Sequence, residues 1–328
     1  MEGTTLIITD SMVRKHLSID DVIARVEDTW RWYGEGRIIM PVKVTTDMGP
    51  AGVEGWFNSM PSYVGPSDMA GLKLVGGYAG NPRHGLPYIR ANLLLTDPHT
   101  GFLRALVAGD WISDMRTGAQ PAVAAKYFAA ATDVVAIIGA GRQATMCLRC
   151  MARTLPMKEV RVCDLAPEAR RSFIDRFPDA PFRLVDCPGR EATCRGADVI
   201  ITVTTADEPL VEEPWVKRGA LVMTMGSYTE ISPELSRKAD KLVVDHLGQG
   251  MHRGSFKDMV DSGELTAQSF AAEVTEVVAG KKVGRDDAGQ RIIVALVGMG
   301  CLDLSVGALA YERIIASGEN VPRIDLAG

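Results

Sequence analysis

The sequence predicts an α/β protein in which a doubly wound parallel sheet is joined to a second part of α+β type. Short apolar runs alternate with helical patterns between residues 134 and 246, which is typical of a parallel sheet covered by helices on both faces. Between residues 42 and 107, short extended pieces are broken by glycine and proline instead. A glycine-rich turn, "IIGAGRQA", follows the first strand of the alternating region. The length of the chain is consistent with this two-part organisation, because 328 residues suffice for two domains.

The first part of the chain is expected to hold a short strand, two helices and a mostly antiparallel sheet. "LIITD" is the strand, and two stretches of helical spacing follow it. Ser18 precedes the second helix, where its hydroxyl can cap free amide groups. The extended pieces of residues 42–107 form the sheet. Residues 109–129 return to helical spacing, and we expect an interruption near Pro121, since proline lacks an amide hydrogen and clashes with the preceding turn.

The alternating region supplies the parallel sheet. Its expected strands are residues 134–139, 159–164, 182–186, 198–204, 220–226 and 241–246, and its helices are 143–154, 167–177 and 189–197. A polar loop at residues 279–290 is expected to lead into an apolar closing helix.

Composition favours small-molecule chemistry. A net charge of -5 argues against a broad nucleic-acid or anionic-membrane surface, which needs basic residues. No apolar run reaches the roughly 20 residues of a membrane span, and the N-terminus lacks the basic region of a signal peptide, so we expect a cytoplasmic protein. The six cysteines are scattered and predict no metal site; the one CxxC pair, Cys147 and Cys150, has a redox role only as the lesser alternative.

The glycine turn predicts a dinucleotide site. Residues 139–144 fit the pattern G-x-G-x-x-A: Gly139 allows the tight turn, Gly141 lets backbone amides approach a pyrophosphate, and Ala144 permits close packing of helix on strand. Asp164 ends the next strand, at about the spacing at which a carboxylate binds the ribose hydroxyls.

The same carboxylate bears on the choice of cofactor. Asp164 would repel a 2'-phosphate, which favours NAD over NADP. A structural role for Asp164 at the strand end is the alternative. Three nearby arginines keep NADP open: Arg142, Arg170 and Arg171.

Cations gather in the first part of the chain. No acidic residue occurs from Met69 to Thr96, whereas this stretch contains Lys73, Arg83, His84 and Arg90. This bias suggests an anionic ligand. Lys73 stands in an apolar strand, where burial would lower its pKa and suit it to proton donation or to binding a carboxylate. A lysine reaching out from a strand edge is the structural alternative.

Arg116, in "DMRTGAQ", precedes the alternating region. Its planar guanidinium can hold a carboxylate through two hydrogen bonds. A salt bridge between domains explains the residue equally well.

These residues belong to a series of motifs that resembles one family in order and over nearly the whole chain. The motifs are Lys73 with "GLP", then "DPHTG", "DMRTGAQPAVAAKY", "IIGAGRQA", "MGSYTEISPEL" and "GMGCLDLSVGALAYE". Together they are similar to the ornithine cyclodeaminase and mu-crystallin family. The resemblance implies a central Rossmann domain and a substrate and dimerisation domain built from both chain ends, with the active site between them. We therefore expect a substrate domain at residues 1–118, a Rossmann domain at 119–300, and a C-terminal helix, 301–328, that returns to the first domain.

The resemblance also implies roles for single residues. Lys73 and Arg116 would address the substrate carboxylate, and Asp303 in "CLDLS" would lie near the nicotinamide. Besides the residues of the glycine turn and Asp164, the cofactor-binding set is expected to include Arg142, Gln143, Thr117 and Ser227.

Departures from the family pattern indicate which reaction to expect. Cyclodeaminases that resemble this chain carry an aspartate and a lysine for substrate recognition and deamination, where this sequence has Tyr228 and Ser232. Lys43 stands where the family often has an arginine, and it can still bind an anion as a point charge. Tyr88 replaces a threonine of the cyclodeaminases. These departures point to the reductases of the family.

The expected reaction is NAD(P)H-dependent reduction of a 2-imino acid to an amino acid by a homodimer. Tyr88, Arg90 and His84 would read the rest of the substrate, and their positive character favours a dicarboxylic imine such as iminosuccinate over a cyclic imine such as pyrroline-2-carboxylate. Two other classes stay open. A cyclodeaminase would need Glu230 as its anchoring acid, and a non-catalytic dinucleotide-binding protein like mu-crystallin would need neither Lys73 nor Arg116.

Overall fold

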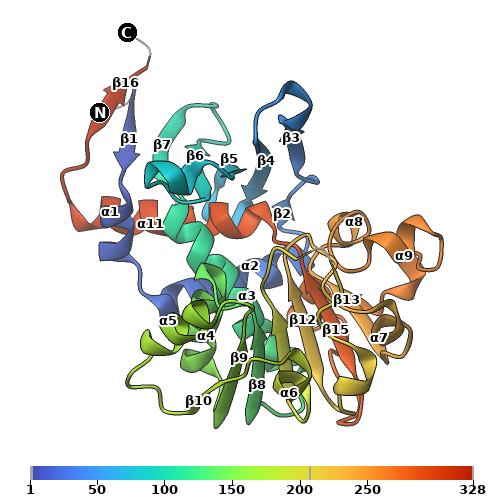
Figure 1. Ribbon diagram of the computed structural model, residues 1–328. Helices are drawn as coiled ribbons and strands as arrows, with labels where there is room; N and C mark the ends of the chain where they lie inside the picture. The colour runs from blue at the N-terminus through green and yellow to red at the C-terminus, as the bar shows by residue number, and fades with distance from the viewer. Residues whose placement is uncertain (1–2, 207, 327–328) are drawn as a thin grey trace. The chain divides into compact units, whose positions relative to one another are not determined.

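The computed structural model describes residues 3–206 and 208–326, which form two compact units. Unit 1 comprises Met1–Arg116 and Met299–Gly328, and unit 2 comprises Thr117–Gly298. In Figure 1 the blue start and the red end of the chain run side by side as β1 and β16, which pair from Thr4 and Asp325 onward. Unit 1 is therefore built from both ends of the chain.

The described residues of unit 1 form a mostly antiparallel sheet of eight strands. Its strands are β1 (Thr4–Ile8), β2 (Ile38–Ile39), β3 (Val44–Asp47), β4 (Gly55–Val64), β5 (Met69–Tyr78), β6 (Ile89–Thr96), β7 (Leu103–Ala108) and β16 (Arg323–Asp325). They pair in the order β16-β1-β7-β6-β5-β4-β2, and β3 also pairs with β4. Among the strands of the described residues in this sheet, only β1 and β7 run parallel to each other.

Helices pack on one face of this sheet. They are α1 (Asp10–His16), α2 (Ile19–Gly34), the first residues of α3 (Asp110–Phe128), and α11 (Gly300–Ser317), with short 3-10 turns at η1 (Gly49–Ala51), η2 (Gly65–Ser67) and η3 (Asn81–His84). Helix α2 begins as the sequence predicts: the Ser18 hydroxyl accepts from the backbone amide of Asp21, whose carboxylate accepts from the amide of Ser18. Helix α11 lies against α2, β4, β5 and β6.

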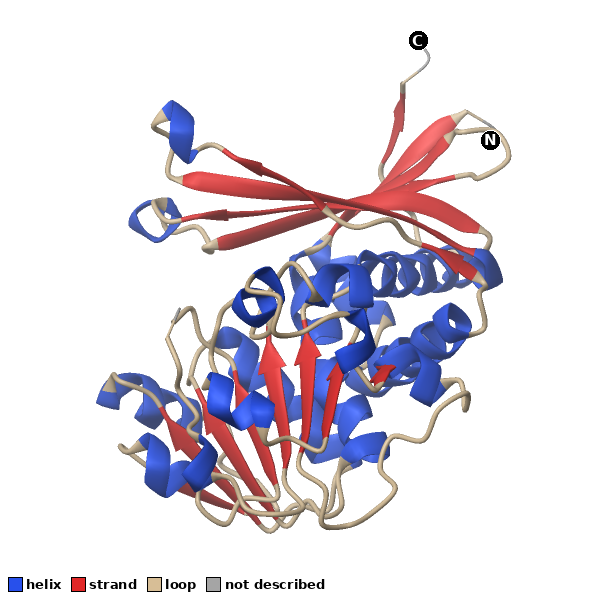
Figure 2. Cartoon of the chain, turned by 90° about the vertical axis from the view of Figure 1, so that its right-hand side faces the viewer, coloured by secondary structure: helices blue, strands red, loops and turns tan. Residues whose placement is uncertain are grey.

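The other face of the sheet carries an apolar row. Figure 2 shows helices against one face of this sheet and none, among the described residues, against the other. Leu72, Leu94 and Leu106 pair across β5, β6 and β7, and they alternate with buried neighbours such as Leu93 and Leu95. Leu106 and Leu74 are exposed. An uncovered apolar sheet face of this kind is a candidate surface for association.

Eight parallel strands form the sheet in the described part of unit 2. They are β8 (Val134–Ile138), β9 (Glu159–Cys163), β10 (Arg183–Asp186), β11 (Val199–Thr202), β12 (Leu221–Met225), β13 (Lys241–Val244), β14 (Ala272–Glu273) and β15 (Ile292–Leu296). The order is β10-β9-β8-β11-β12-β15-β13-β14, and every neighbouring pair is parallel. The direction in which strands are added reverses between β8 and β11, so a dinucleotide is expected at the carboxyl ends of these two strands.

The helices of unit 2 connect these strands. They are the remainder of α3, α4 (Arg142–Thr154), α5 (Pro167–Asp175), α6 (Arg190–Cys194), α7 (Pro233–Arg237), α8 (Leu247–Gly250), α9 (Lys257–Asp261) and α10 (Val274–Val278), with 3-10 turns η4 (Glu213–Trp215) and η5 (Ala267–Ser269). The predicted fold class, α/β with a doubly wound parallel sheet and an α+β part, is confirmed.

Two predictions about elements are wrong. Helix α3 is not interrupted near Pro121 but continues through it. A proline costs the helix one hydrogen bond, and burial of side chains such as Ile112, Met115 and Val123 outweighs that loss. The apolar segment after the polar loop is not helical throughout, because it opens with strand β15, inserted between β12 and β13. A short, fully buried apolar run has the same pattern in a strand and in a helix.

Within the described part of the chain, no helix combines the length and apolar character needed to cross a membrane.

Candidate functional site

Unit 1 contains a buried cluster of charged side chains drawn from three elements. Lys73 on β5 donates from Nζ to Oδ1 of Asp303 on α11, at 2.9 Å, and to the hydroxyl of Ser113 on α3, also at 2.9 Å. Arg116, one turn beyond Ser113, donates from Nε to the same Asp303 oxygen at 3.0 Å. The structure thus brings together Lys73, Arg116 and Asp303, the three residues for which the sequence predicts catalytic roles. The role of Ser113 was missed, although its place three residues before Arg116 puts both on one helix face.

A close approach of α11 to the sheet explains how Asp303 reaches Lys73. Met60 on β4 and Lys73 on β5 are direct partners, so their side chains share a face. Gly300 lies against Met60, where an added Cβ would meet the Met60 backbone at 3.0 Å. Asp303 follows three residues later on the same side of the helix, a rise of about 4.5 Å. Neighbouring strands are about 4.8 Å apart, which nearly equals this rise. Gly300 therefore lies over β4 and Asp303 over β5.

Burial lowers the pKa of Lys73. Lys73 is 1% exposed, and burial, followed by the positive charge of Arg116, lowers its pKa to about 8, against the opposing effect of Asp303. An ammonium group with such a pKa is mostly protonated at neutral pH and still gives up its proton readily. The cluster can therefore act as a proton donor.

The cluster also has hydrogen-bonding capacity left over within the described residues. Oδ2 of the buried Asp303 has no partner there. Lys73 uses two of its three ammonium hydrogens, and Arg116 uses Nε and, more weakly at 3.5 Å, Nη2. Donors of this kind suit a carboxylate, and the open Asp303 oxygen suits an N–H group.

Lys43 extends the same row of the sheet. It directly precedes β3, whose first residue, Val44, pairs with Ser59 on β4. The next residue on β4, Met60, pairs with Lys73. Lys43 is 9% exposed, so a third buried cation stands two strands from Lys73.

The other three residues predicted to contact the substrate do not join this cluster. His84, in η3, and Tyr88 are exposed. Arg90 on β6 is also exposed and forms an ion pair with Asp110 at 3.2 Å. Its neighbour Ala91 is buried and pairs with Val75, which shares the face of Lys73, so Arg90 points to the opposite face of the sheet.

Unit 2 carries the predicted glycine turn between β8 and α4. Gly139 has a φ of +104°, and an added Cβ would lie 2.3 Å from the carbonyl oxygen of Val203. Only glycine fits there without strain. Gly141 is the N-cap of the thirteen-residue helix α4, and nothing lies within 4 Å of where its Cβ would be. The turn therefore combines open space with the N-terminus of a helix, as a pyrophosphate requires.

Asp164 lies just beyond β9, beside this turn. Its carboxylate accepts from the amide of Ala140 at 2.8 Å and from that of Ala166 at 2.9 Å. Arg170 forms an ion pair with Asp186 and donates to the backbone carbonyl of Asp164 at 2.7 Å. It is thus engaged rather than turned toward a 2'-phosphate. The residues present fit NAD.

The remaining residues predicted to bind the cofactor have varied surroundings. Arg142 and Ser227 are exposed, Gln143 and Thr117 are half-buried, and Ala144 is buried. Their roles stay predictions.

Glu230, which a cyclodeaminase would need as an anchoring acid, is buried in unit 2. One carboxylate oxygen accepts from the amide and the hydroxyl of Thr204, at 2.8 and 2.6 Å, and the other accepts from the hydroxyl of Thr202 at 2.9 Å. Burial raises the pKa of Glu230 to about 7, while the bonds from these threonines favour the charged form. Both oxygens are thus already engaged.

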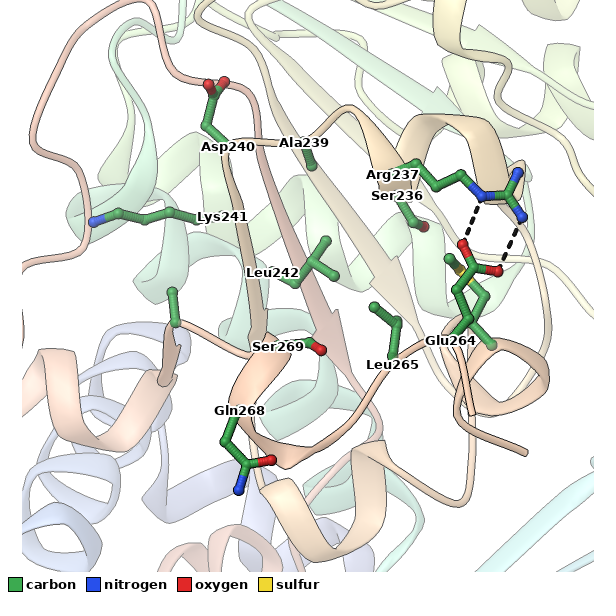
Figure 3. Close-up of a pocket in the computed structure, with 12 residues that line it drawn as sticks. Ser236, Arg237, Ala239, Asp240, Lys241, Leu242, Glu264, Leu265, Gln268 and Ser269 are labelled. Atoms are coloured by element: carbon green, nitrogen blue, oxygen red, sulfur yellow. Dashed lines mark hydrogen bonds and ion pairs between the residues drawn. The ribbon is translucent and has the colours of Figure 1, made fainter. Parts of the chain in front are cut away.

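Two other features carry no candidate site. A cavity of about 400 Å³ in unit 2, shown in Figure 3, contains none of the predicted site residues. Its charged groups pair with partners: Arg237 makes two hydrogen bonds to Glu264, and Lys241 pairs with Asp286. The CxxC cysteines, Cys147 and Cys150, are buried on α4, and burial raises the pKa of Cys147, which disfavours the reactive thiolate.

Comparison with known proteins gives a consistent result. The chain is 32% identical over 317 residues to an alanine dehydrogenase of Archaeoglobus fulgidus, which covers 95% of this chain and 96% of that protein. An archaeal alanine dehydrogenase dimer with bound NAD superposes with a TM-score of 0.92 at 31% identity, covering 98% of this chain and 99% of the other. The Delta(1)-pyrroline-2-carboxylate reductase of Thermococcus litoralis, in complex with NADH and L-proline, has a TM-score of 0.91 at 29% identity, covering 98% and 100%. Residues 4–318 match the model of one family, and the chain belongs to it: the ornithine cyclodeaminase/mu-crystallin family.

Proposed function

We propose that this chain is an NAD-dependent oxidoreductase that reduces a 2-imino acid to the corresponding amino acid. The observation that carries the proposal is the buried cluster of Lys73, Arg116 and Asp303, which offers donors for a carboxylate, a proton for nitrogen and an acceptor for an N–H group. Relatives named as an alanine dehydrogenase and a pyrroline-2-carboxylate reductase support it.

Each residue of the cluster has a separate task. Arg116 holds the substrate carboxylate through its remaining guanidinium hydrogens, which fixes the orientation of the C=N bond. Lys73 donates a proton to the imine nitrogen as the carbon is reduced, so that the product nitrogen carries the added hydrogen. Asp303 keeps Lys73 charged and accepts an N–H of the substrate through Oδ2.

Unit 2 would hold the dinucleotide. The amides of the turn from Gly139 to Ala144 would bind the pyrophosphate, and Asp164 would exchange its amide partners for the ribose hydroxyls. NADH bound there supplies the hydride for the C=N carbon.

The face around Lys73 favours a small apolar substrate side chain. Met60 pairs with Lys73, and the next apolar residues on this face are Val75 and Ala91, which are buried with Met60 in one small cluster. Of the cations expected to bind a second carboxylate, Arg90 lies on the opposite face of the sheet and His84 is exposed in η3. We therefore favour the imine of pyruvate or of a related alkyl 2-oxo acid.

A dicarboxylic imine such as iminosuccinate is the second candidate. The buried Lys43, two strands from Lys73 in the same row, is the observation that favours it. In this case Lys43 would bind the second carboxylate as a point charge.

A homodimer is part of the proposal. The uncovered row of Leu72, Leu94 and Leu106 is an apolar sheet face that a second copy can bury. The related archaeal alanine dehydrogenase is described as a dimer. Light scattering at micromolar concentration checks this part, and a monomer would contradict it.

One assay tests the proposed reaction. The purified protein is incubated with NADH, ammonia and either pyruvate or oxaloacetate, and in parallel with ornithine and NAD, while NADH absorbance and ammonia are followed. Oxidation of NADH with pyruvate supports the first candidate, and a preference for oxaloacetate that Lys43→Met abolishes supports the second. Release of ammonia from ornithine, or no reaction with any substrate, would contradict the proposal.

A further inference from the structure

The loop that follows β11 is held at both of its ends by one residue, Glu230. At its start, the Glu230 carboxylate accepts from the hydroxyl of Thr202 and from the amide and hydroxyl of Thr204. At its end, the Glu230 backbone carbonyl accepts from the amide of Leu210 at 2.8 Å and from that of Val211 at 3.3 Å. The Thr204 hydroxyl also accepts from the amide of Ala206 at 3.0 Å. Glu230 therefore holds the described residues at the start and at the end of this loop in place.

The start of the same loop forms one wall of the glycine turn. Val203 donates to the carbonyl of Ile138 at 2.8 Å, which continues the pairing of β11 with β8 beyond the strand ends. The carbonyl oxygen of Val203 and the methyl group of Thr204 lie 2.3 and 3.1 Å from where a Cβ of Gly139 would stand. A shift of Thr204 would therefore change the packing around Gly139, the first glycine of the turn.

We propose that Glu230 is a positioning residue for dinucleotide binding, which acts by fixing Val203 and Thr204 against Gly139. The inference rests on the proposed NAD site. In this role Glu230 contacts neither substrate nor cofactor. Its carboxylate, buried among neutral donors, holds Thr202 and Thr204 in place, and the raised pKa of about 7 is the expected result of such burial.

Asp198 provides a matched control in the same unit. It stands just before β11, at the amino end, whereas Glu230 acts at the carboxyl end. Asp198 is also a buried carboxylate that accepts from a backbone amide, that of Val134, at 2.8 Å, and it pairs with Lys217 at 2.5 Å. Its removal should cost stability without moving the glycine turn.

The experiment measures two quantities for each variant: the dissociation constant of NADH, by fluorescence titration, and the melting temperature without cofactor. Glu230→Ala should raise the dissociation constant tenfold or more, since an amide and two hydroxyls lose their buried acceptor. Glu230→Gln should stay within about threefold of wild type, because its carbonyl oxygen can serve both groups of Thr204 and its amide can donate to the Thr202 hydroxyl. Asp198→Ala should lower the melting temperature and leave NADH affinity near wild type.

Thr204→Val removes one hydroxyl and keeps the side-chain volume, so it serves if Glu230→Ala does not fold. It should weaken NADH binding by about threefold to tenfold with little change in melting temperature. NADH affinity that is unchanged in Thr204→Val and in any folded Glu230→Ala protein would overturn the inference, as would an equal loss of affinity in Asp198→Ala. A wild-type protein that binds no NADH would overturn the proposed function itself, and the inference with it.

Discussion

Lys73 in unit 1 and Glu230 in unit 2 are both buried ionisable residues, and their surroundings differ in kind. Burial brings the two pKa values toward neutrality, to about 8 for the lysine and about 7 for the glutamate. Lys73 shares the carboxylate of Asp303 with Arg116, and hydrogen-bonding groups remain unused in the described residues. Glu230 meets only neutral donors, which occupy both of its oxygens.

This difference in hydrogen bonding indicates that the two buried groups have different roles, one in ligand binding and one in structure. A cluster with unused donors and an open acceptor is ready for a ligand, whereas a carboxylate whose oxygens are fully engaged holds its own chain in place. We therefore assign chemistry to Lys73 and loop position to Glu230. The expected effects of substitutions follow from this division.

The largest expected effect is that of Lys73→Met. Methionine keeps most of the apolar packing of the stem and removes the ammonium group, so imine reduction should fall by roughly a hundredfold or more, the usual value of a positioned acid. NADH affinity should not change, because the glycine turn lies in the other unit. Steady-state rates and an NADH titration measure the two effects. A folded variant that binds NADH and works at near wild-type rate would make Lys73 a structural residue.

The second largest effect on imine reduction is expected for Arg116→Lys. The change keeps the positive charge and removes the planar fork, which should cost about 1 to 3 kcal/mol in kcat/KM, or roughly five- to 150-fold. The loss should appear for the carboxylate-bearing substrate and not in NADH affinity. If kcat/KM is unchanged, Arg116 only neutralises Asp303, and Lys73 alone binds the carboxylate.

The two regions also differ in how far the sequence predicts them. The glycine turn, Asp164 and the cations Lys73 and Arg116 stand in local patterns, so their places could be named from the sequence. The contact of Lys73 with Asp303 joins residues 230 positions apart. It depends on how α11 packs against the sheet, which no local sequence pattern predicts.

The structure differs from the sequence-based expectation where side chains alternate along a strand or where a strand is fully buried. Arg90 lies only two positions from Tyr88 in the same basic stretch as Lys73, yet the alternation of β6 sends it to the opposite face. Strand β15 is buried throughout and therefore lacks a period that distinguishes it from a helix. The bonds between Glu230 and Thr204 span a loop and could not be anticipated from spacing.

The pH dependence of reduction should report on Lys73. Because burial and Arg116 lower its pKa to about 8, the ammonium form that donates the proton disappears above this pH. The value of kcat/KM for imine reduction should then fall about tenfold per pH unit above 8, and oxidation of the amino acid, which needs the neutral amine, should rise through the same range. Rates in both directions between neutral and alkaline pH measure this. A flat profile in both directions would contradict the assignment.

Asp303→Asn sharpens the same test. Asp303 raises the pKa of Lys73 by its charge and its hydrogen bond, so its neutralisation should move the fall in reduction to lower pH. The pH profile of the variant measures the displacement. An unmoved profile would show that another group titrates.

The smallest expected effect is that of Arg90→Ala. Arg90 carries the same charge as Arg116 and lies on a strand next to that of Lys73, so it is the matched cation outside the cluster. Its side chain is exposed and paired with Asp110, and surface pairs of this kind contribute at most about 1 kcal/mol. The KM for the 2-oxo acid in reductive amination should therefore change by less than about twofold. An increase of tenfold with oxaloacetate, but not with pyruvate, would mean that Arg90 reads a second carboxylate. The substrate would then be the dicarboxylic imine, and the apolar cluster of Met60, Val75 and Ala91 would not select the substrate side chain.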